Sequence, residues 1–240
     1  MPQYSVAALE KHWLANQTQF RTAASACHEA FALMISVMSD VGSLLSGRKV
    51  LDINCAYLLL TKAMNHVAST LLLIERGLMV DGALTSRNAI ETLLLLELLA
   101  KKPELCRKWS AGEQLTPGSV RKELAKLSKV EVGDLVIEVS SDTWDETRFV
   151  YDWLSQITHA NLDSLNQSAS QTDRNNFVLH VGGVLLFPVA IAITKSLGHT
   201  CLRSMATCLA VFEPTKLQMM SAQFERLGES LISLSPGEKN

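Results

Sequence analysis

The sequence predicts an all-α protein, a single-domain helical bundle of long antiparallel helices, and three observations lead to this prediction. Hydrophobic residues make up 48% and charged residues 19% of the 240 residues, a balance that excludes intrinsic disorder. Apolar residues recur at helical spacing, for example at Phe31, Ile35, Met38 and Val41. The 6 prolines and 12 glycines are too few for collagen, a low-complexity linker or a turn-rich β-sandwich. We expect one domain over residues 1–240.

The N-terminal part is expected to hold the long helices of the bundle. Gly77 suits the position just after a helix C-terminus, and Asp81 or Thr85 can cap the helix that follows. The leucine-rich stretch of that helix is apolar nearly all round, so we expect it to lie centrally in the bundle. The expected helices span residues 4–45, as one helix or two stacked helices, then 50–76 and 81–100.

A smaller helical insert is expected over about residues 103–140. Pro103 ends the preceding helix and begins a short one that Gly112 closes, and Thr116-Pro117 repeats this start. The window Val130–Val139 has partial alternation of apolar residues, but no partner strand is visible, so we expect a loop or a short irregular piece. The expected helices of the insert span residues 103–112 and 117–129.

The C-terminal part is expected to return to long helices. The segment Asn161–Asn176 is rich in serine, asparagine and glutamine, so we interpret it as a surface loop. Asp142 or Thr143 begins the helix before this loop, and Glu213-Pro214 separates the last two helices. We expect helices at residues 142–160, 183–211 and 215–234, followed by a frayed tail at 235–240.

Charge and cysteine usage favour a cytoplasmic protein. The 22 Lys and Arg against 24 Asp and Glu give a net charge of −2, which lacks the basic excess typical of nucleic-acid binding. The 5 cysteines are odd in number and none forms a C-x-x-C pair, so we expect reduced, buried thiols. The N-terminal residues have no basic region followed by an apolar one, and we expect no signal peptide.

One apolar segment tests this expectation. Phe177–Thr194 runs for 18 residues without a charge, which just reaches the length of a membrane span. It contains His180, the Gly182-Gly183 pair and Pro188, and no dense run of lysine or arginine flanks it. We therefore interpret it as a buried core helix preceded by a Gly-Gly turn, and we expect no membrane partner.

Two polar constellations interrupt the apolar pattern, and the first lies just before the leucine-rich stretch. Arg87 and Glu91 are four residues apart, so they share one helix face and can pair, with Asn88 beside them. Their position places a charged pair at or near the bundle core. A ligand-binding role and a salt bridge that fixes helix register both fit this pattern.

The second constellation is a polar stripe on the helix expected at 142–160. Arg148, Tyr151, Ser155 and His159 follow one another at steps of 3, 4 and 4, with Asp152 one position off the stripe. If the stripe faces Arg87, the two constellations form one hydrogen-bonded site in which His159 can handle a proton. The alternative is a satisfied polar layer inside the bundle.

The familiar motifs of metal and cofactor chemistry do not occur. The 6 histidines show no zinc-ligand spacing, and the sequence contains neither a Gly-rich nucleotide loop nor a G-x-S-x-G nucleophile elbow. We therefore expect no metal site and no cofactor.

At these constellations the chain resembles a broad, largely uncharacterised group of bacterial helical proteins. The shared pattern is R-x-x-x-E before a leucine-rich run, then P-E, then Y-x-x-L-S-x-x-x-H. Here these are Arg87 with Glu91, then Pro103-Glu104, then Tyr151 through His159. The resemblance covers about residues 60–212, and it implies a helical fold without a defined activity.

A looser resemblance is to HEPN domains, helical bundles that often cut RNA in toxin–antitoxin and phage-defence systems. Their motif is an arginine and a polar residue, then four residues and a histidine. Arg87-Asn88 begins this motif, but Leu93 occupies the position of the histidine. A nuclease of this kind would need His159 to reach Arg87 from another helix.

These observations favour a binding or regulatory module whose pocket holds a small polar ligand or a protein partner. The predicted pocket residues are Arg87, Asn88, Glu91, Arg148, Tyr151, Ser155 and His159. The alternative is a metal-independent ribonuclease of a toxin or defence system, in which RNA is the substrate and Arg87 and His159 are catalytic. A third hypothesis is a homo-oligomer formed through the apolar helices. Whether the chain is an enzyme stays open.

Overall fold

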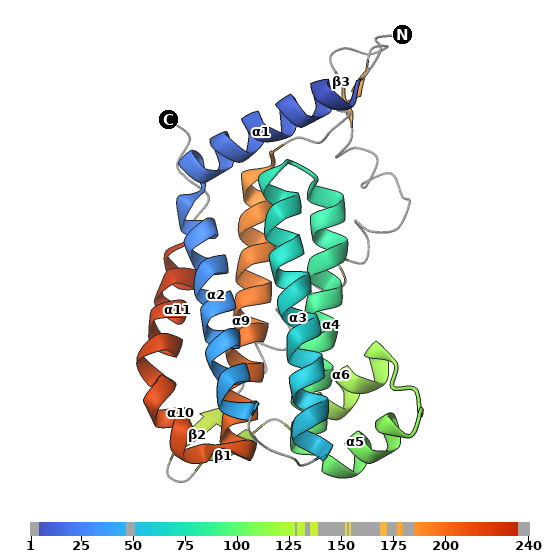
Figure 1. Cartoon of the computed structure of the whole chain (residues 1–240), viewed down its shortest axis with the longest axis vertical. Helices are drawn as coiled ribbons and strands as arrows, with labels where there is room; N and C mark the ends of the chain where they lie inside the picture. The colour runs from blue at the N-terminus through green and yellow to red at the C-terminus, as the bar shows by residue number, and fades with distance from the viewer. Residues whose placement is uncertain are drawn as a thin grey trace.

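Long α-helices make up most of the chain that the computed structural model describes (Figure 1). The all-α bundle predicted from the sequence is confirmed, with two short β-hairpins added to it. Buried residues of the long helices form one hydrophobic cluster. The described residues are 5–46, 51–127, 129–132, 135–138, 152, 154, 169–171, 177–179 and 185–234.

The first predicted segment consists of two helices, α1 (Val6–Ala23) and α2 (Ser25–Leu45). The chain leaves helical geometry at Ala24, where φ is −127° and ψ is 38°. Helix α1 crosses one end of the bundle, whereas α2 runs along it (Figure 1). This placement explains their burial, because α1 buries only Asn16 and Phe20 while α2 buries a whole face.

The next two helices, α3 (Leu51–Glu75) and α4 (Met79–Lys101), form an antiparallel hairpin. Gly77 has a φ of 81° between them, a left-handed conformation that glycine adopts without strain and that the sequence predicted. The start of α4 differs from the prediction. Leu78 precedes the first helical residue, and Asp81 lies inside the first turn, where its charge favours the helix N-terminus.

The predicted insert contains two short helices, α5 (Pro103–Ser110) and α6 (Pro117–Lys126). Thr116 caps α6 as expected, since its hydroxyl accepts a hydrogen bond from the Ser119 N–H at 3.2 Å.

The prediction of a loop or a short irregular piece at residues 130–139 is wrong. Strands β1 (Lys129–Val132) and β2 (Leu135–Glu138) pair with each other in antiparallel register, with Val130 opposite Ile137. Both strands of this hairpin fall within one short segment, which the prediction treated as a single strand candidate. In the sequence a Gly-Asp dipeptide, typical of two-residue hairpin connections, separates them.

A second correction concerns residues 161–194. Strands β3 (Ala169–Gln171) and β4 (Phe177–Leu179) form another antiparallel hairpin, so this part is neither all loop nor one continuous helix. The predicted core helix exists as α9 (Phe187–Phe212), which begins four residues later than expected, with Pro188 in its first turn. The Gly182-Gly183 pair and most of the helix predicted at 142–160 lie outside the described residues.

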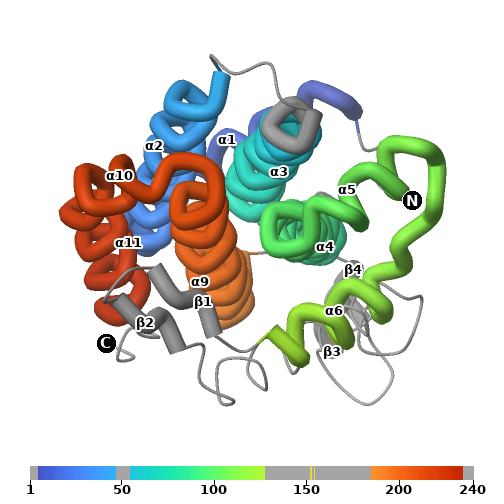
Figure 2. Tube along the Cα trace, turned by 90° about the horizontal axis from the view of Figure 1, so that it is seen from below, coloured from blue at the N-terminus to red at the C-terminus, as the bar shows by residue number. Residues whose placement is uncertain are grey.

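Helix α9 lies at the centre of the bundle, with α2 and α11 on one side and α4 on the other (Figure 2). The chain ends in α10 (Pro214–Leu217), a 3₁₀ turn η1 (Gln218–Met220) and α11 (Ser221–Ser233), so the helix predicted at 215–234 is divided.

The expectation of reduced, buried thiols is confirmed, because all the cysteines are free and buried. Burial in α9 raises the pKa of Cys201 to about 12.

Candidate functional site

The polar residues predicted on the third long helix lie together on α4. Arg87 Nε donates a hydrogen bond to Glu91 Oε1 at 3.0 Å, so the predicted pair forms. The Asn88 side chain is exposed beside them, and the backbone carbonyl of Asn88 accepts a hydrogen bond from the Thr92 hydroxyl. Arg87 and Glu91 each take part in further interactions beyond this pair. Helix α4 therefore presents a cation, an anion and an amide side by side.

The pair was predicted at or near the bundle core, and it lies near the core, at the edge of the bundle. The Arg87 and Glu91 side chains keep 24% and 23% of their surface accessible. The leucine-rich stretch that is buried nearly all round begins one residue after Glu91, so the pair falls just outside it. Accessible residues of α4 follow one line at helical spacing, which we call the α4 strip. Its members are Leu84, Arg87, Asn88, Glu91 and Leu95.

The position at which the HEPN motif has its histidine lies in the hydrophobic core of this chain. Leu93, at the position that the motif gives to histidine, is fully buried in the hydrophobic cluster. A side chain at this position points away from the α4 strip, because Leu93 comes two residues after Glu91 and so lies on nearly the opposite side of the helix.

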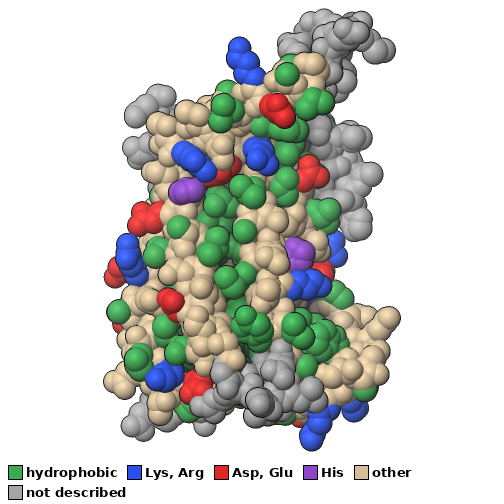
Figure 3. All heavy atoms as spheres, in the orientation of Figure 1, with side chains coloured by type: hydrophobic (Ala, Val, Ile, Leu, Met, Phe, Trp, Pro, Cys, Tyr) green, Lys and Arg blue, Asp and Glu red, His purple; other side chains and the backbone are tan. Residues whose placement is uncertain are grey.

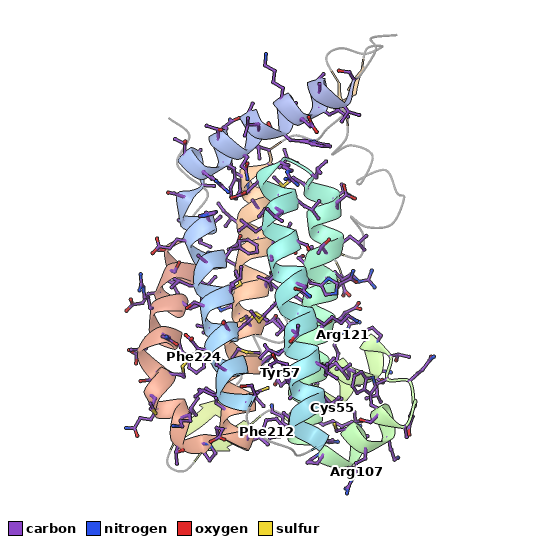
Figure 4. All side chains as sticks on the ribbon, in the orientation of Figure 1. Cys55, Tyr57, Arg107, Arg121, Phe212 and Phe224 are labelled. Atoms are coloured by element: carbon purple, nitrogen blue, oxygen red, sulfur yellow. The ribbon has the colours of Figure 1, made fainter. Side chains whose placement is uncertain are left out.

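The second predicted constellation lies outside the described residues, which include neither Arg148, Tyr151, Ser155 nor His159. Its neighbours Asp152 and Leu154 are described, and both are helical. Asp152 Oδ1 lies 3.8 Å from Arg121 Nη1 of α6, and Leu154 is fully buried in the core. Helix α6 packs on α4, and Figure 4 shows Arg121 on the side of α6 that faces α4.

Two fully buried carboxylates carry the strongest polar clusters of the described chain, and the first is Glu97 of α4. Lys101 Nζ donates to Glu97 Oε1 at 2.9 Å, and Arg203 Nε of α9 donates to Oε2 at 2.8 Å. The cations are themselves nearly buried, with 11% of Lys101 and 8% of Arg203 accessible. The Ser204 hydroxyl donates to the Leu93 carbonyl at 3.1 Å. These contacts join α4 to α9 inside the bundle.

The second buried carboxylate is Glu75, the last residue of α3. It accepts hydrogen bonds from Gln17 Nε2 at 2.7 Å and from Arg21 Nε and Nη2 at 3.1 and 3.2 Å, all on α1. His28 Nδ1 of α2 lies 2.8 Å from Glu75 Oε1. Asn16 Nδ2 donates to the Arg76 carbonyl at 2.8 Å. One carboxylate thus holds α1 and α2 against the end of α3.

The surroundings of Glu75 keep it ionised. Burial raises the pKa of the carboxyl, but hydrogen bonds from Arg21, Gln17 and His28, together with the charge of Arg21, outweigh burial and hold the pKa below its ordinary value. The side chains that contact Glu75 are open to water, with 54% of Arg21 and 40% of His28 accessible.

Both clusters depend on partners from distant segments, although Lys101, four residues after Glu97 on α4, is a partner that spacing could have found. Glu75 lies 47 to 58 positions from its partners on α1 and α2, and Glu97 lies 106 positions from Arg203. Spacing rules detect only partners within one helix, such as Arg87 with Glu91. A glutamate inside the most apolar stretch of the chain was the available signal for Glu97, since such a charge must be paired when buried.

A hollow of about 630 Å³ lies away from these groups, along the outer side of α1. The surface of its described lining is mostly apolar, and none of the predicted pocket residues belongs to it. The lining residues are Lys11, Leu14, Ala15, Thr18, Gln19, Thr22 and Ala23.

Within the described residues, no group of three or more His, Cys, Asp or Glu side chains is placed to hold a metal ion. One described helix, Cys55–Glu75, is long and apolar enough to cross a membrane by length and composition, which is weak evidence because soluble core helices pass the same test.

Comparison of the chain with protein-family models, with curated proteins and with solved structures gives no match. The chemistry of the site therefore has to be argued from its own residues.

Proposed function

We propose that the chain is a binding or regulatory module that holds a small polar ligand on the α4 strip, with Arg87 gripping a carboxylate or phosphate group. The observation that carries this proposal is the 3.0 Å bond from Arg87 Nε to Glu91, made by two side chains that are three-quarters buried. A guanidinium held in this way is oriented before the ligand arrives, so less side-chain freedom is lost on binding. Glu91 and Asn88 add an acceptor and an amide beside it.

The side of α4 that carries the strip is also reinforced. Lys102 Nζ donates to Glu123 Oε2 at 2.6 Å, which ties the end of α4 to α6. Arg121 of α6 in turn lies 3.8 Å from Asp152. The predicted site residues Arg148, Tyr151, Ser155 and His159 belong in sequence to the segment that contains Asp152, and their part in the site stays a prediction.

The test is a thermal-shift titration with inorganic phosphate and with succinate as probes. For a dissociation constant near 1 mM, a probe at about 10 mM stabilises the folded chain by ~1.4 kcal/mol. That stabilisation raises Tm by about 3–6 °C for a chain of this size. Arg87→Ala is expected to abolish the shift, and Arg107→Ala, which removes an exposed arginine of α5, is expected to keep it.

A wild-type chain that shows no shift with either probe contradicts the proposal, and so does an equal shift in the Arg87→Ala variant. The ribonuclease alternative has less support, because Leu93 is fully buried at the position where the HEPN motif has its histidine.

A further inference from the structure

The face formed by α2 and α3 differs from the rest of the described surface in its pattern of side chains. Between the two helices, hydrophobic side chains follow a long line, whereas the surface of α2 beside it is mostly polar or backbone (Figure 3). In the apolar window of α3, only 33% of residues are buried. Soluble proteins rarely leave the apolar side of a long helix without a partner.

The two helices contribute complementary shapes to this face. Apart from Glu29, the exposed positions of α2 recur at helical spacing and carry small side chains, which let another helix approach closely. They are Ser25, Ala26, Ala32, Ser36, Ser39 and Ser43. Helix α3 instead exposes large apolar side chains, with Tyr57, Leu58 and Leu72 at 44%, 66% and 45% accessible. Figure 4 places Tyr57 on the side of α3 that faces α2.

The two edges of the face carry opposite charge. Helix α2 contains no lysine or arginine, and its acids Glu29 and Asp40 lie on the edge toward α11, where Gln223 Nε2 donates to Asp40 at 3.0 Å. On α3, Lys62 lies two helical turns after Cys55, whose Sγ is 3.1 Å from Ser110 Oγ of α5. Lys62 therefore lies on the opposite edge, toward α4 and α5.

The acid and the base lie at the same height on the bundle. Two contacts fix the register of the antiparallel helices, His28 with Glu75 and Gly42 with Leu60. Asp40 comes two residues before Gly42, and Lys62 comes two residues after Leu60. Because both helices rise equally per residue, Asp40 and Lys62 are level across the face.

From these observations we infer that a second copy of this chain docks on the α2–α3 face, related by a two-fold axis parallel to the helices. Such an axis exchanges the two edges without changing height, so Asp40 of each copy meets Lys62 of the other. It also lays the large side chains of α3 over the small side chains of α2 in the second copy. An anionic membrane fits less well, because Glu29 and Asp40 border the face.

The first experiment is sedimentation velocity from about 1 to about 100 μM, a range in which a dimer of ordinary interface size separates from a monomer. The wild type is expected to be a dimer. Ser36→Arg puts a large charge on the small surface of α2 and is expected to weaken association at least about 10-fold. The control is Ile232→Arg, an exposed position of α11 turned away from Gln223 and Arg226, and it is expected to keep the dimer.

The second experiment tests the two-fold arrangement itself. Lys62→Glu and Asp40→Lys are each expected to weaken the dimer about 5-fold, since each puts two like-charged pairs in place of two exposed ion pairs. The double variant Asp40→Lys with Lys62→Glu is expected to recover most of the affinity.

A wild type that stays monomeric at about 100 μM overturns the inference. A dimer that Ser36→Arg leaves intact overturns the choice of face, and a double variant no tighter than the single ones overturns the symmetry. Circular dichroism of each variant separates loss of association from loss of fold. None of these outcomes depends on ligand binding at Arg87.

Discussion

Glu75 and Glu97 are both fully buried carboxylates with cationic partners, but their surroundings are opposite. The cations at Glu97 are nearly buried and come from α4 and α9, the central pair of the bundle. At Glu75 the cation is Arg21, which is about half accessible and belongs to α1, a helix that buries only two of its residues. The same kind of ion pair therefore joins two central helices at Glu97 and holds the peripheral helix α1 at Glu75.

The largest expected loss of folding stability follows from breaking the buried cluster at Glu97. Glu97→Gln leaves Arg203 and Lys101 buried without their anion, and removing one partner of a buried pair costs about 3–5 kcal/mol. Urea unfolding followed by circular dichroism measures the loss. Glu113→Gln, at an exposed loop position, is the control and is expected to stay within about 0.5 kcal/mol. Equal stability of the two variants would show that Glu97 does not lock the core.

A packing change in the same core gives the next largest effect. A Cβ on Gly198 of α9 would overlap the Leu231 side chain, which is fully buried between α9 and α11. Gly198→Ala is therefore expected to destabilise the fold by about 1–3 kcal/mol.

The matched control is Gly228→Ala in α11, where a Cβ meets no atom within 4 Å. Because alanine favours helix, this variant is expected to be more stable than wild type by about 0.5–1 kcal/mol. Both variants are compared by urea unfolding. If Gly198→Ala were more stable than wild type, the core around Leu231 would be able to accommodate an added methyl group, which would contradict the prediction.

The difference between contacts within one helix and contacts between distant helices explains which features the sequence could predict. Helix ends marked by Gly77, Pro103 and Thr116-Pro117 depend on neighbouring residues, and they were found from those residues. The Arg87–Glu91 pair lies within one helix and was also predicted from the sequence. How deeply the pair is buried was not predicted. Depth depends on which helices pack against α4, and that information is spread over the whole chain.

The two buried carboxylate clusters were missed because they depend on contacts between distant segments. Glu97 meets Arg203 only because α4 packs on α9, and Glu75 meets Arg21 only because α1 folds back over the end of α3. The β1–β2 hairpin was missed for a local reason, because its two strands are 4 residues each and were taken as one window.

A smaller, local effect is expected where Glu75 fastens α1. The pKa of Glu75 is below its ordinary value in the folded chain, so its contribution to stability is present above the unfolded pKa and is lost as the pH falls through the folded one. Hydrogen exchange should therefore show α1 amides losing protection below about pH 4.5, before those of α4.

The Glu75→Gln variant is expected to lose α1 protection already at neutral pH while α4 and α9 stay protected. Protection of α1 that is unchanged in this variant would mean that Phe20 and Asn16 suffice to hold the helix.

The smallest effect is expected at the surface. Hydrogen bonds from Lys102 and Lys126 and the charges of both lysines lower the pKa of Glu123 to about 2. NMR titration of the carboxyl carbon should show this value, and Lys102→Ala should move it back toward the ordinary one. The unfolding transition of Lys102→Ala is expected to stay close to that of wild type, because an ion pair that water partly reaches at the surface contributes little to stability.

The central claim is that Arg87 binds an anionic group on the α4 strip, and the Arg87 side chain itself offers the most direct measurement. The Nε–Hε signals of the arginines are followed by NMR while inorganic phosphate or succinate is added. The proposal predicts a saturable shift of the Arg87 signal with at least one probe and none of the Arg107 signal. An Arg87 signal that does not move with either probe, or that moves only as Arg107 does, would contradict it.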